Sequence, residues 1–338
     1  MQQKVLIVGP KFYGYSLSVE KAFKKLGFST VVMTFSEKDV ENSAEKIAYH
    51  LTRDKPGFFE KKRIRFNIRF RKIYDNFQPD IVFIIKGSTL YPESITHAKN
   101  SINILWMMDS IYRNDYSYNL RKLVDHLFLF EETDVEKLRE EEGIVSHFLP
   151  LALDESVYYP VQNEKDIDVL FVGMLYGNRI RLIDQVIKNF PGKKIKVYGK
   201  FFSPLREPLK YLFRKNRHIY INKNIEPELL NKLYSRTKVC LNIHHDQSVV
   251  GVNQRFFEIL GSRSLEITDY KPYMGKHFTT GDLFWYRTEE EMLSQIGEAL
   301  DNYQQLGTVI KNGYQKVIAA HTFTERMRYV LDVIGYKK

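Results

Sequence analysis

Five residues at the start of one helix-like stretch could together bind a nucleotide. In residues 251–269, GVNQRFFEILGSRSLEITD, an entry turn with Gly251 and Asn253 leads into an apolar helical pattern that carries Arg255 and Glu258 in its first two turns. Backbone N–H groups at a helix start, with a guanidinium beside them, suit a diphosphate. A carboxylate one turn further can accept from both vicinal hydroxyls of a ribose. The stretch therefore predicts a nucleotide-binding loop from Gly251 through Val252 to Asn253, followed by Arg255 and Glu258. Taken alone, Glu258 could also be a surface carboxylate.

Two more strand-end loops combine glycine with a basic residue. The segment FVGMLYGNRIR places Arg179 just after Gly173 and Gly177, and VYGK places Lys200 after Gly199. Glycine leaves the backbone open to a ligand, and an arginine beside a helix start favours a diphosphate. We therefore predict that Arg179, Gly199 and Lys200 belong to the same donor site, with a solvated helix arginine as the alternative for Arg179.

A lysine and an aspartate follow two strands of the first half. Lys86 ends FIIKG, and Asp109 ends LWMMD. A lone aspartate after a strand is often a helix cap. Two such residues at the ends of strands in one sheet can both point into a cleft, where the carboxylate could deprotonate a hydroxyl and the ammonium could meet a phosphate. Both are predicted catalytic residues.

Alternating strand and helix patterns must position these residues. Apolar, β-branched segments fall at 4–9, 29–35, 79–87, 102–109, 125–130 and 145–151, and then at 167–173, 193–199, 238–243 and 264–269. Helical patterns lie between them, and Gly27 closes the first helix. This order predicts α/β architecture with parallel sheets, in which ligands bind beyond the carboxyl ends of the strands. The segment 150–163 has no regular hydrophobic pattern, and it predicts a linker between two Rossmann-like domains that face each other across a cleft.

Composition narrows the class of protein. The chain has 338 residues, 43% of them hydrophobic, and one cysteine, Cys240, so no intrachain disulfide can form. No apolar run approaches the roughly 20 residues of a membrane span. The start, MQQKVLIVGP, predicts a first strand rather than a signal peptide. Gly9 and Gly14 do not have dinucleotide-site spacing, and no acid ends the second strand, which argues against hydride transfer. We expect a cytoplasmic protein.

Several segments resemble CgeB-like glycosyltransferases of the broader group-1 type. The similar segments are PDIVFIIKG, INILWMMDS, DVLFVGMLYGNR, VYGK, VNQRFFEILGSRSLEITD, GDLFWYRTEEEMLSQI and AAHTFTERM, and they are densest over residues 165–330. The resemblance implies a GT-B fold with an acceptor-binding domain at 1–155, a nucleotide-sugar domain at 164–320 and a C-terminal helix at 321–338 that could cross back to the first domain.

The same resemblance implies roles for individual residues. Glu258 takes the ribose-binding position, Asn253 and Arg255 lie near the diphosphate, and Asn224 with Ile225 lies along the base. The family often carries a second glutamate eight positions earlier, where this chain has Val250. Glu258 and Glu266 share that spacing, but Glu266 lies inside the next strand pattern, so we interpret the match as coincidence. His244 is expected to contact the donor sugar. The resemblance implies no required metal or other cofactor, and adjacent His244 and His245 without a nearby cysteine make a poor zinc site.

A basic segment could bind an anionic surface. Residues 53–74 hold nine Lys or Arg against two acids within a net charge of +10. Phe59, Phe66, Phe70, Ile73 and Tyr74 form one helical stripe that predicts a core face. Ile64 and Ile68 lie among the basic residues, and Lys61, Lys62, Arg63 and Arg65 are expected off the stripe. No nucleic-acid motif accompanies the segment, so we predict docking on the inner face of a membrane.

Together these patterns predict a glycosyltransferase that moves a sugar from a nucleotide-diphosphate donor to a glycan or lipid-linked hydroxyl, in surface-polysaccharide or spore-coat synthesis. Two alternatives stay open. One is a non-catalytic nucleotide-sugar-binding protein, and the other is a polyol-phosphate transferase that uses a CDP-alcohol.

Overall fold

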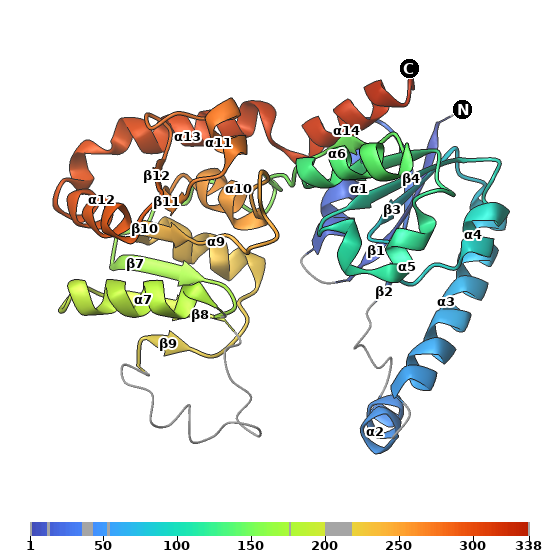
Figure 1. Ribbon diagram of the computed structural model, residues 1–338, viewed down its shortest axis with the longest axis horizontal. Helices are drawn as coiled ribbons and strands as arrows, with labels where there is room; N and C mark the ends of the chain where they lie inside the picture. The colour runs from blue at the N-terminus through green and yellow to red at the C-terminus, as the bar shows by residue number, and fades with distance from the viewer. Residues whose placement is uncertain are drawn as a thin grey trace. The chain divides into compact units, whose positions relative to one another are not determined.

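The chain divides into two units, each built on its own parallel sheet. A computed structural model describes residues 2–11, 14–35, 43–52, 55–175, 177–199 and 218–336, so Lys200 lies outside the described residues. The first unit comprises Met1–Pro150 and Phe323–Lys338, and the second comprises Leu151–Thr322. Figure 1 labels most of the elements of both units.

The first unit has a six-stranded sheet in the order β2-β1-β3-β4-β5-β6, with every neighbouring pair parallel. Its strands are β1 (Lys4–Pro10), β2 (Ser29–Phe35), β3 (Ile81–Ile85), β4 (Ile102–Met107), β5 (His126–Leu129) and β6 (His147–Phe148). Every residue of β3 is buried, as expected for a central strand covered by helices on both faces.

Helices cover both faces of this first sheet. The helices of this unit are α1 (Tyr15–Lys25), α2 (Ser43–Leu51), α3 (Lys55–Phe77), α4 (Pro92–His97), η2 (Ile111–Arg113), α5 (Asp115–Leu120), α6 (Glu132–Glu142) and α14 (Phe323–Val333), and α2 lies at the far end of α3, away from the sheet (Figure 1). Helices α3 to α6 contribute Phe70, Ile95, Leu120 and Leu138 to one buried cluster. In the other helices, Phe23 of α1 packs on Phe83, and Phe323 of α14 packs on Trp106. The end of the chain therefore completes the core of the first unit.

Glycine ends α1 as the sequence predicts. Gly27 has φ 85°, in the left-handed region that glycine tolerates best. Its N–H donates to the Lys24 carbonyl, and the N–H of Phe28 donates to the Phe23 carbonyl. These bonds satisfy carbonyl groups at the end of the helix and turn the chain into β2.

Helix α3 contains the basic segment. Phe70 and Tyr74 are buried, and Phe66 and Ile73 pack against the same cluster, which confirms most of the predicted core stripe. Ile64 and Ile68 are 46% and 64% exposed. Arg63 differs from the expectation, because it is only 5% exposed and lies over the rings of Tyr91 and Tyr116. It is a core residue, not a surface cation. Among the described residues, no helix is long and apolar enough to cross a membrane.

The second unit repeats the plan with the strand order β12-β11-β10-β7-β8-β9, again with parallel neighbours. Its strands are β7 (Ile167–Val172), β8 (Ile195–Tyr198), β9 (Tyr220–Ile221), β10 (Thr237–Asn242), β11 (Leu265–Asp269) and β12 (Phe284–Tyr286). The sequence patterns predicted four of these strands. The short strands β9 and β12 at the two sheet edges are additions.

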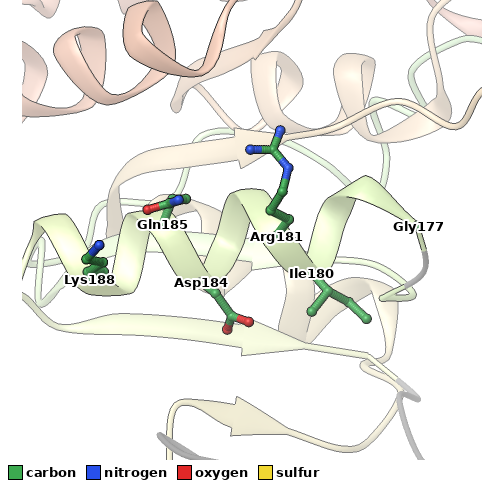
Figure 2. A pocket seen from close by; sticks show the side chains of 6 residues that line it. All are labelled: Gly177, Ile180, Arg181, Asp184, Gln185 and Lys188. Atoms are coloured by element: carbon green, nitrogen blue, oxygen red, sulfur yellow. The ribbon is translucent and has the colours of Figure 1, made fainter.

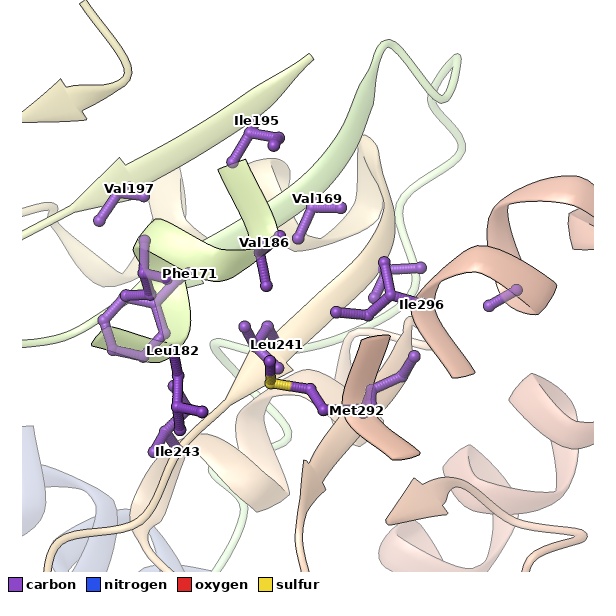
Figure 3. Close-up of a cluster of buried hydrophobic side chains, with 14 of the residues drawn as sticks. Val169, Phe171, Leu182, Val186, Ile195, Val197, Leu241, Ile243, Met292 and Ile296 are labelled. Carbon is purple, nitrogen blue, oxygen red and sulfur yellow. The ribbon is translucent and has the colours of Figure 1, made fainter. Parts of the chain in front are cut away.

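Helices of the second unit also cover both faces of its sheet. They are α7 (Asn178–Asn189), α9 (Pro227–Ser235), α10 (Gln254–Gly261), α11 (Pro272–His277), α12 (Glu289–Asp301), η3 (Tyr303–Gln305) and α13 (Gly307–Ala320). Figure 3 shows Leu182 and Val186 of α7 and Met292 and Ile296 of α12 meeting the strand residues on one face. Helix α10 packs against α9 and α13. Its apolar side is therefore buried while its first turn begins near the strand ends.

Candidate functional site

The loop after β10 leads into α10, and Asn253 fixes the point at which the helix begins. Its side-chain oxygen accepts from the N–H of Phe256 at 3.1 Å, which satisfies one of the free donors of the first turn. Gly251 and Val252 precede it in a buried loop. Because the Asn253 side chain holds the helix start, the predicted contact of this loop with a diphosphate rests on backbone N–H groups.

Arg255 ties the first turn of α10 to the end of β7. Its Nε donates to the Val172 carbonyl, and its Nη1 lies 3.8 Å from Oε2 of Glu258. The side chain remains 28% exposed. The arginine therefore joins two strand-end loops and keeps part of its guanidinium accessible to an anion.

Glu258 is a buried carboxylate with an unused acceptor. Its side chain is 9% exposed, and Oε2 has no hydrogen-bond partner among the described residues. Burial raises the pKa of Glu258, while Arg255 and the nearby hydroxyls of Tyr158 and Tyr234 oppose that shift. A buried acceptor without a partner is energetically unfavourable, so a ligand hydroxyl that donates to Oε2 would be favoured there.

Arg179, in the first turn of α7, joins the ends of two strands. Its guanidinium donates to the Met174 carbonyl at 3.1 Å and to the Ile243 carbonyl at 2.5 Å. Gly177 supplies the left-handed turn before the helix, with φ 52°. The structure therefore places Arg179 beside the β7 and β10 ends, and its role in a donor site stays a prediction.

The other residues predicted to bind the donor follow β8 and β9, at one lateral edge of the same sheet. Gly199 directly follows β8, and its N–H donates to the Ile221 carbonyl at 3.3 Å. Asn224 is exposed and Ile225 is half-buried, in the loop between β9 and α9. All the strands of this sheet run in one direction, so these loops share the carboxyl edge with α10.

His244 is bonded to an aspartate that sequence reasoning did not select. Its Nδ1 lies 2.9 Å from Oδ1 of Asp269, which also accepts from the His244 backbone N–H at 2.7 Å. Burial opposes ionisation of Asp269, yet His244 and Lys271 together hold its pKa below the usual value. The His244 side chain is fully buried, and its Nε2 has no hydrogen-bond partner among the described residues. Direct contact of the ring with a sugar therefore requires a local opening.

A polar pocket of about 240 Å³ lies at these strand ends. Arg179 and His244 line it together with Asp269, Lys271 and Arg287, which the sequence analysis did not select. A second hollow, shown in Figure 2, follows the surface of α7 from Gly177 to Lys188. Because one helix alone lines that second hollow, it cannot enclose a ligand as the strand-end pocket can. The described residues contain no group of three His, Cys, Asp or Glu side chains placed to hold a metal ion.

In the first unit, the two predicted catalytic residues form an ion pair. Nζ of Lys86 lies 2.5 Å from Oδ2 of Asp109, and their side chains are 20% and 36% exposed. Lys86 also has φ 65°, an uncommon conformation for a residue other than glycine. Backbone strain of this kind is often found at functional sites. The structure thus brings Lys86 and Asp109 together at the ends of β3 and β4.

Comparisons with known proteins point to one fold and one kind of domain. Residues 179–332, just under half of the chain, match the family model described as "Glycosyl transferase-like". The match covers most of the second unit and reaches into α14 of the first, and α10 with Arg255 and Glu258 lies inside the matched range. A comparison with curated protein sequences gave no match.

Solved structures share the whole architecture. Sucrose-phosphate synthase from Thermosynechococcus elongatus has a TM-score of 0.68 at 13% identity, over 99% of each chain. Anabaena HepE in complex with UDP-glucose has a TM-score of 0.66 at 8% identity, over 99% of this chain and 100% of that one. A glycosyltransferase from Rickettsia africae has a TM-score of 0.64 at 11% identity, over 98% and 97%. With two six-stranded parallel sheets, the protein has the GT-B fold.

Proposed function

We propose that the protein is a glycosyltransferase that moves a sugar from a nucleotide-diphosphate donor to a hydroxyl of a glycan or lipid-linked acceptor. The observation that carries this proposal is Glu258, a buried carboxylate whose Oε2 has no described partner, one turn into a helix of a glycosyl transferase-like domain. The solved complexes of Anabaena HepE with UDP-glucose and with UDP support a nucleotide sugar as the donor.

The ribose, the diphosphate and the base of the donor would each contact different loops at the carboxyl ends of the strands. Glu258 accepts from the ribose hydroxyls, and the loop from Gly251 to Asn253 gives N–H groups to the diphosphate. Arg255 and Arg179 add positive charge beside that loop. Asn224 and Ile225 lie along the base. Gly199 and, outside the described residues, Lys200 belong to the same donor site. His244 forms part of the pocket wall and acts with Asp269.

The reaction requires positive charge from the protein to stabilise the departing diphosphate, and a base to take the proton of the acceptor hydroxyl. The acceptor oxygen bonds to the anomeric carbon while the bond from that carbon to the diphosphate oxygen breaks. The two arginines stabilise the diphosphate as it leaves, which makes an added metal unnecessary. Asp109 takes the acceptor proton, and Lys86 holds the carboxylate in place. No step needs a redox cofactor.

Helix α3 gives a reason to place the acceptor at a membrane. Lys61, Arg65, Arg69, Arg71 and Lys72 are exposed on the side that also exposes Ile64 and Ile68. Cations around apolar side chains suit an anionic lipid surface, where each cation contributes about 1 kcal/mol. This face supports peripheral binding at the inner membrane surface and a lipid-linked acceptor in surface-polysaccharide or spore-coat synthesis.

A thermal-shift screen tests the donor assignment. The protein is heated with UDP-, GDP-, ADP-, CDP- and dTDP-linked sugars and, separately, with CDP-glycerol and CDP-ribitol. A ligand at about 100 times its Kd stabilises the fold by about 2.7 kcal/mol, an easily measured shift. We expect one nucleotide sugar to raise Tm and CDP-alcohols to leave it unchanged. Stabilisation by a CDP-alcohol alone contradicts the proposal.

A further inference from the structure

Glu266 is a buried acid that the donor site does not use. It is the second residue of β11 with none of its surface exposed, and its Oε1 accepts from Nδ2 of Asn242 at 2.8 Å. Burial raises the pKa of Glu266 well above its ordinary value, which favours the uncharged carboxyl form. Its spacing from Glu258 matches a two-glutamate pattern, but Glu266 faces the protein interior.

Asn242 links Glu266 to the start of α10 through hydrogen bonds. Its Nδ2 also donates to Oδ1 of Asn253 at 3.1 Å, and Nδ2 of Asn253 donates back to Oδ1 of Asn242 at 2.8 Å. The same Oδ1 of Asn253 accepts from the Phe256 N–H. A continuous chain of hydrogen bonds therefore runs from Glu266 to the first turn of α10.

The direction of each amide follows from the acceptor at Glu266. An asparagine amide has one acceptor end and one donor end, and turning it over exchanges them. The Glu266 Oε1 draws the donor end of Asn242 toward it, which leaves the acceptor end for Asn253. Asn253 must then present its own oxygen to the Phe256 N–H. Without the acceptor at Glu266, the buried N–H of Asn242 loses one partner, and only the Phe256 N–H still sets the direction of the two amides.

We propose that Glu266 is a positioning residue for nucleotide recognition. Through Asn242 and Asn253 it fixes the first turn of α10, and so the placement of Arg255 and Glu258. This inference rests on the proposed donor site for its functional consequence, but the positioning of α10 can be measured without any ligand.

Two substitutions separate shape from hydrogen bonding. Glu266→Gln keeps the shape and an acceptor oxygen, whereas Glu266→Met keeps the volume and removes the acceptor. Ile267→Ala is the matched control, because Ile267 is equally buried in the same strand but packs in the cluster with α7 and α12. The control creates a cavity without touching the hydrogen-bond chain.

The first readout is amide hydrogen exchange of residues 253–260 in the free protein. We expect Glu266→Met to speed exchange in the first turn of α10 by about tenfold, while Glu266→Gln and Ile267→Ala leave it within about twofold of the parent. Unchanged exchange in the Met variant overturns the proposal. An equal increase in the Ile267→Ala control also overturns it, because general destabilisation then explains the effect.

The second readout is affinity for the nucleotide sugar selected by the thermal-shift screen, in a double-mutant cycle with Glu258→Gln. If Glu266 acts through Glu258, Glu266→Met weakens binding about tenfold in the parent and much less in the Glu258→Gln background. Equal losses in both backgrounds overturn the link to Glu258. If exchange responds as expected but the parent binds no nucleotide sugar, the proposed function fails and the positioning role of Glu266 stands.

Discussion

Replacing Glu258 by glutamine should weaken donor binding and stabilise the fold. Glutamine keeps the shape of the side chain but removes the negative charge of the carboxylate, whose oxygens would accept hydrogen bonds from the ribose hydroxyls. Hydrogen bonds to a charged group contribute about 1.5–3 kcal/mol, so the Glu258→Gln variant should bind the nucleotide sugar about tenfold to 150-fold more weakly. The matched Glu258→Ala variant should lose at least as much.

The stability change has the opposite sign because the pKa of Glu258 is raised in the folded protein. The unfolded chain ionises this residue near pH 4.3, whereas the folded protein holds the proton to higher pH. Stability is therefore lost as the pH rises above about 4.3 toward the raised pKa. Glutamine does not ionise, so the variant avoids this loss. The contact with Arg255 is 3.8 Å long and partly exposed, and its removal costs little.

Calorimetry and thermal melting across pH 5 to 8 measure both effects. A nucleotide sugar is the better ligand, because a free nucleoside diphosphate has a phosphate group that titrates in this range. Parent affinity should fall as the pH drops through the pKa of Glu258, while the affinity of the Glu258→Gln variant stays level. At neutral pH the variant should melt at a higher temperature. A folded variant that binds as tightly as the parent, with the same pH profile, refutes the ribose assignment.

Three further predictions concern the acceptor side, the metal and the membrane. Asp109→Asn should lower transfer by about 10²–10⁴-fold and leave donor affinity unchanged; an unaltered rate excludes Asp109 as the base. Turnover should persist in EDTA, and loss of activity that Mg²⁺ or Mn²⁺ restores contradicts the role given to Arg179 and Arg255. Gln at Lys61, Arg65, Arg69 and Lys72 should abolish salt-sensitive pelleting with anionic liposomes, with Arg63 kept because it is buried. A charge-matched control carries Gln at exposed Lys188, Lys193, Lys232 and Lys311. If this control and the α3 variant pellet equally, α3 is only a solvated face.

Local patterns predicted most of the fold because each reflects a constraint within a few residues. Continuous apolar runs marked the buried strands. Gly27 marked a helix end because glycine tolerates positive φ, and Asn253 marked a helix start because its side chain can cap the first turn. The edge strands β9 and β12 span only Tyr220–Ile221 and Phe284–Tyr286. Runs this short carry no periodicity, so only their pairing with a neighbouring strand identifies them.

Contacts between distant residues were not predictable in the same way. Asp269 ends a strand in the sequence, a signal that could have been used, but its bond to His244 depends on the neighbouring positions of β10 and β11. Tyr158 and Tyr234 reach Glu258 from segments remote in sequence. Arg63 lay within a run of surface-like charges, and only the tertiary structure places it over the rings of Tyr91 and Tyr116.

The most direct test of the central claim is the release of nucleoside diphosphate from a nucleotide sugar, measured with and without an acceptor glycan. We expect the parent to release diphosphate together with a product one sugar heavier, and Glu258→Ala to reduce both in parallel. Tight binding without release, under every acceptor tried, contradicts transferase activity and favours a binding protein. Release of CMP from a CDP-alcohol, with no turnover of any nucleotide sugar, contradicts the assigned donor.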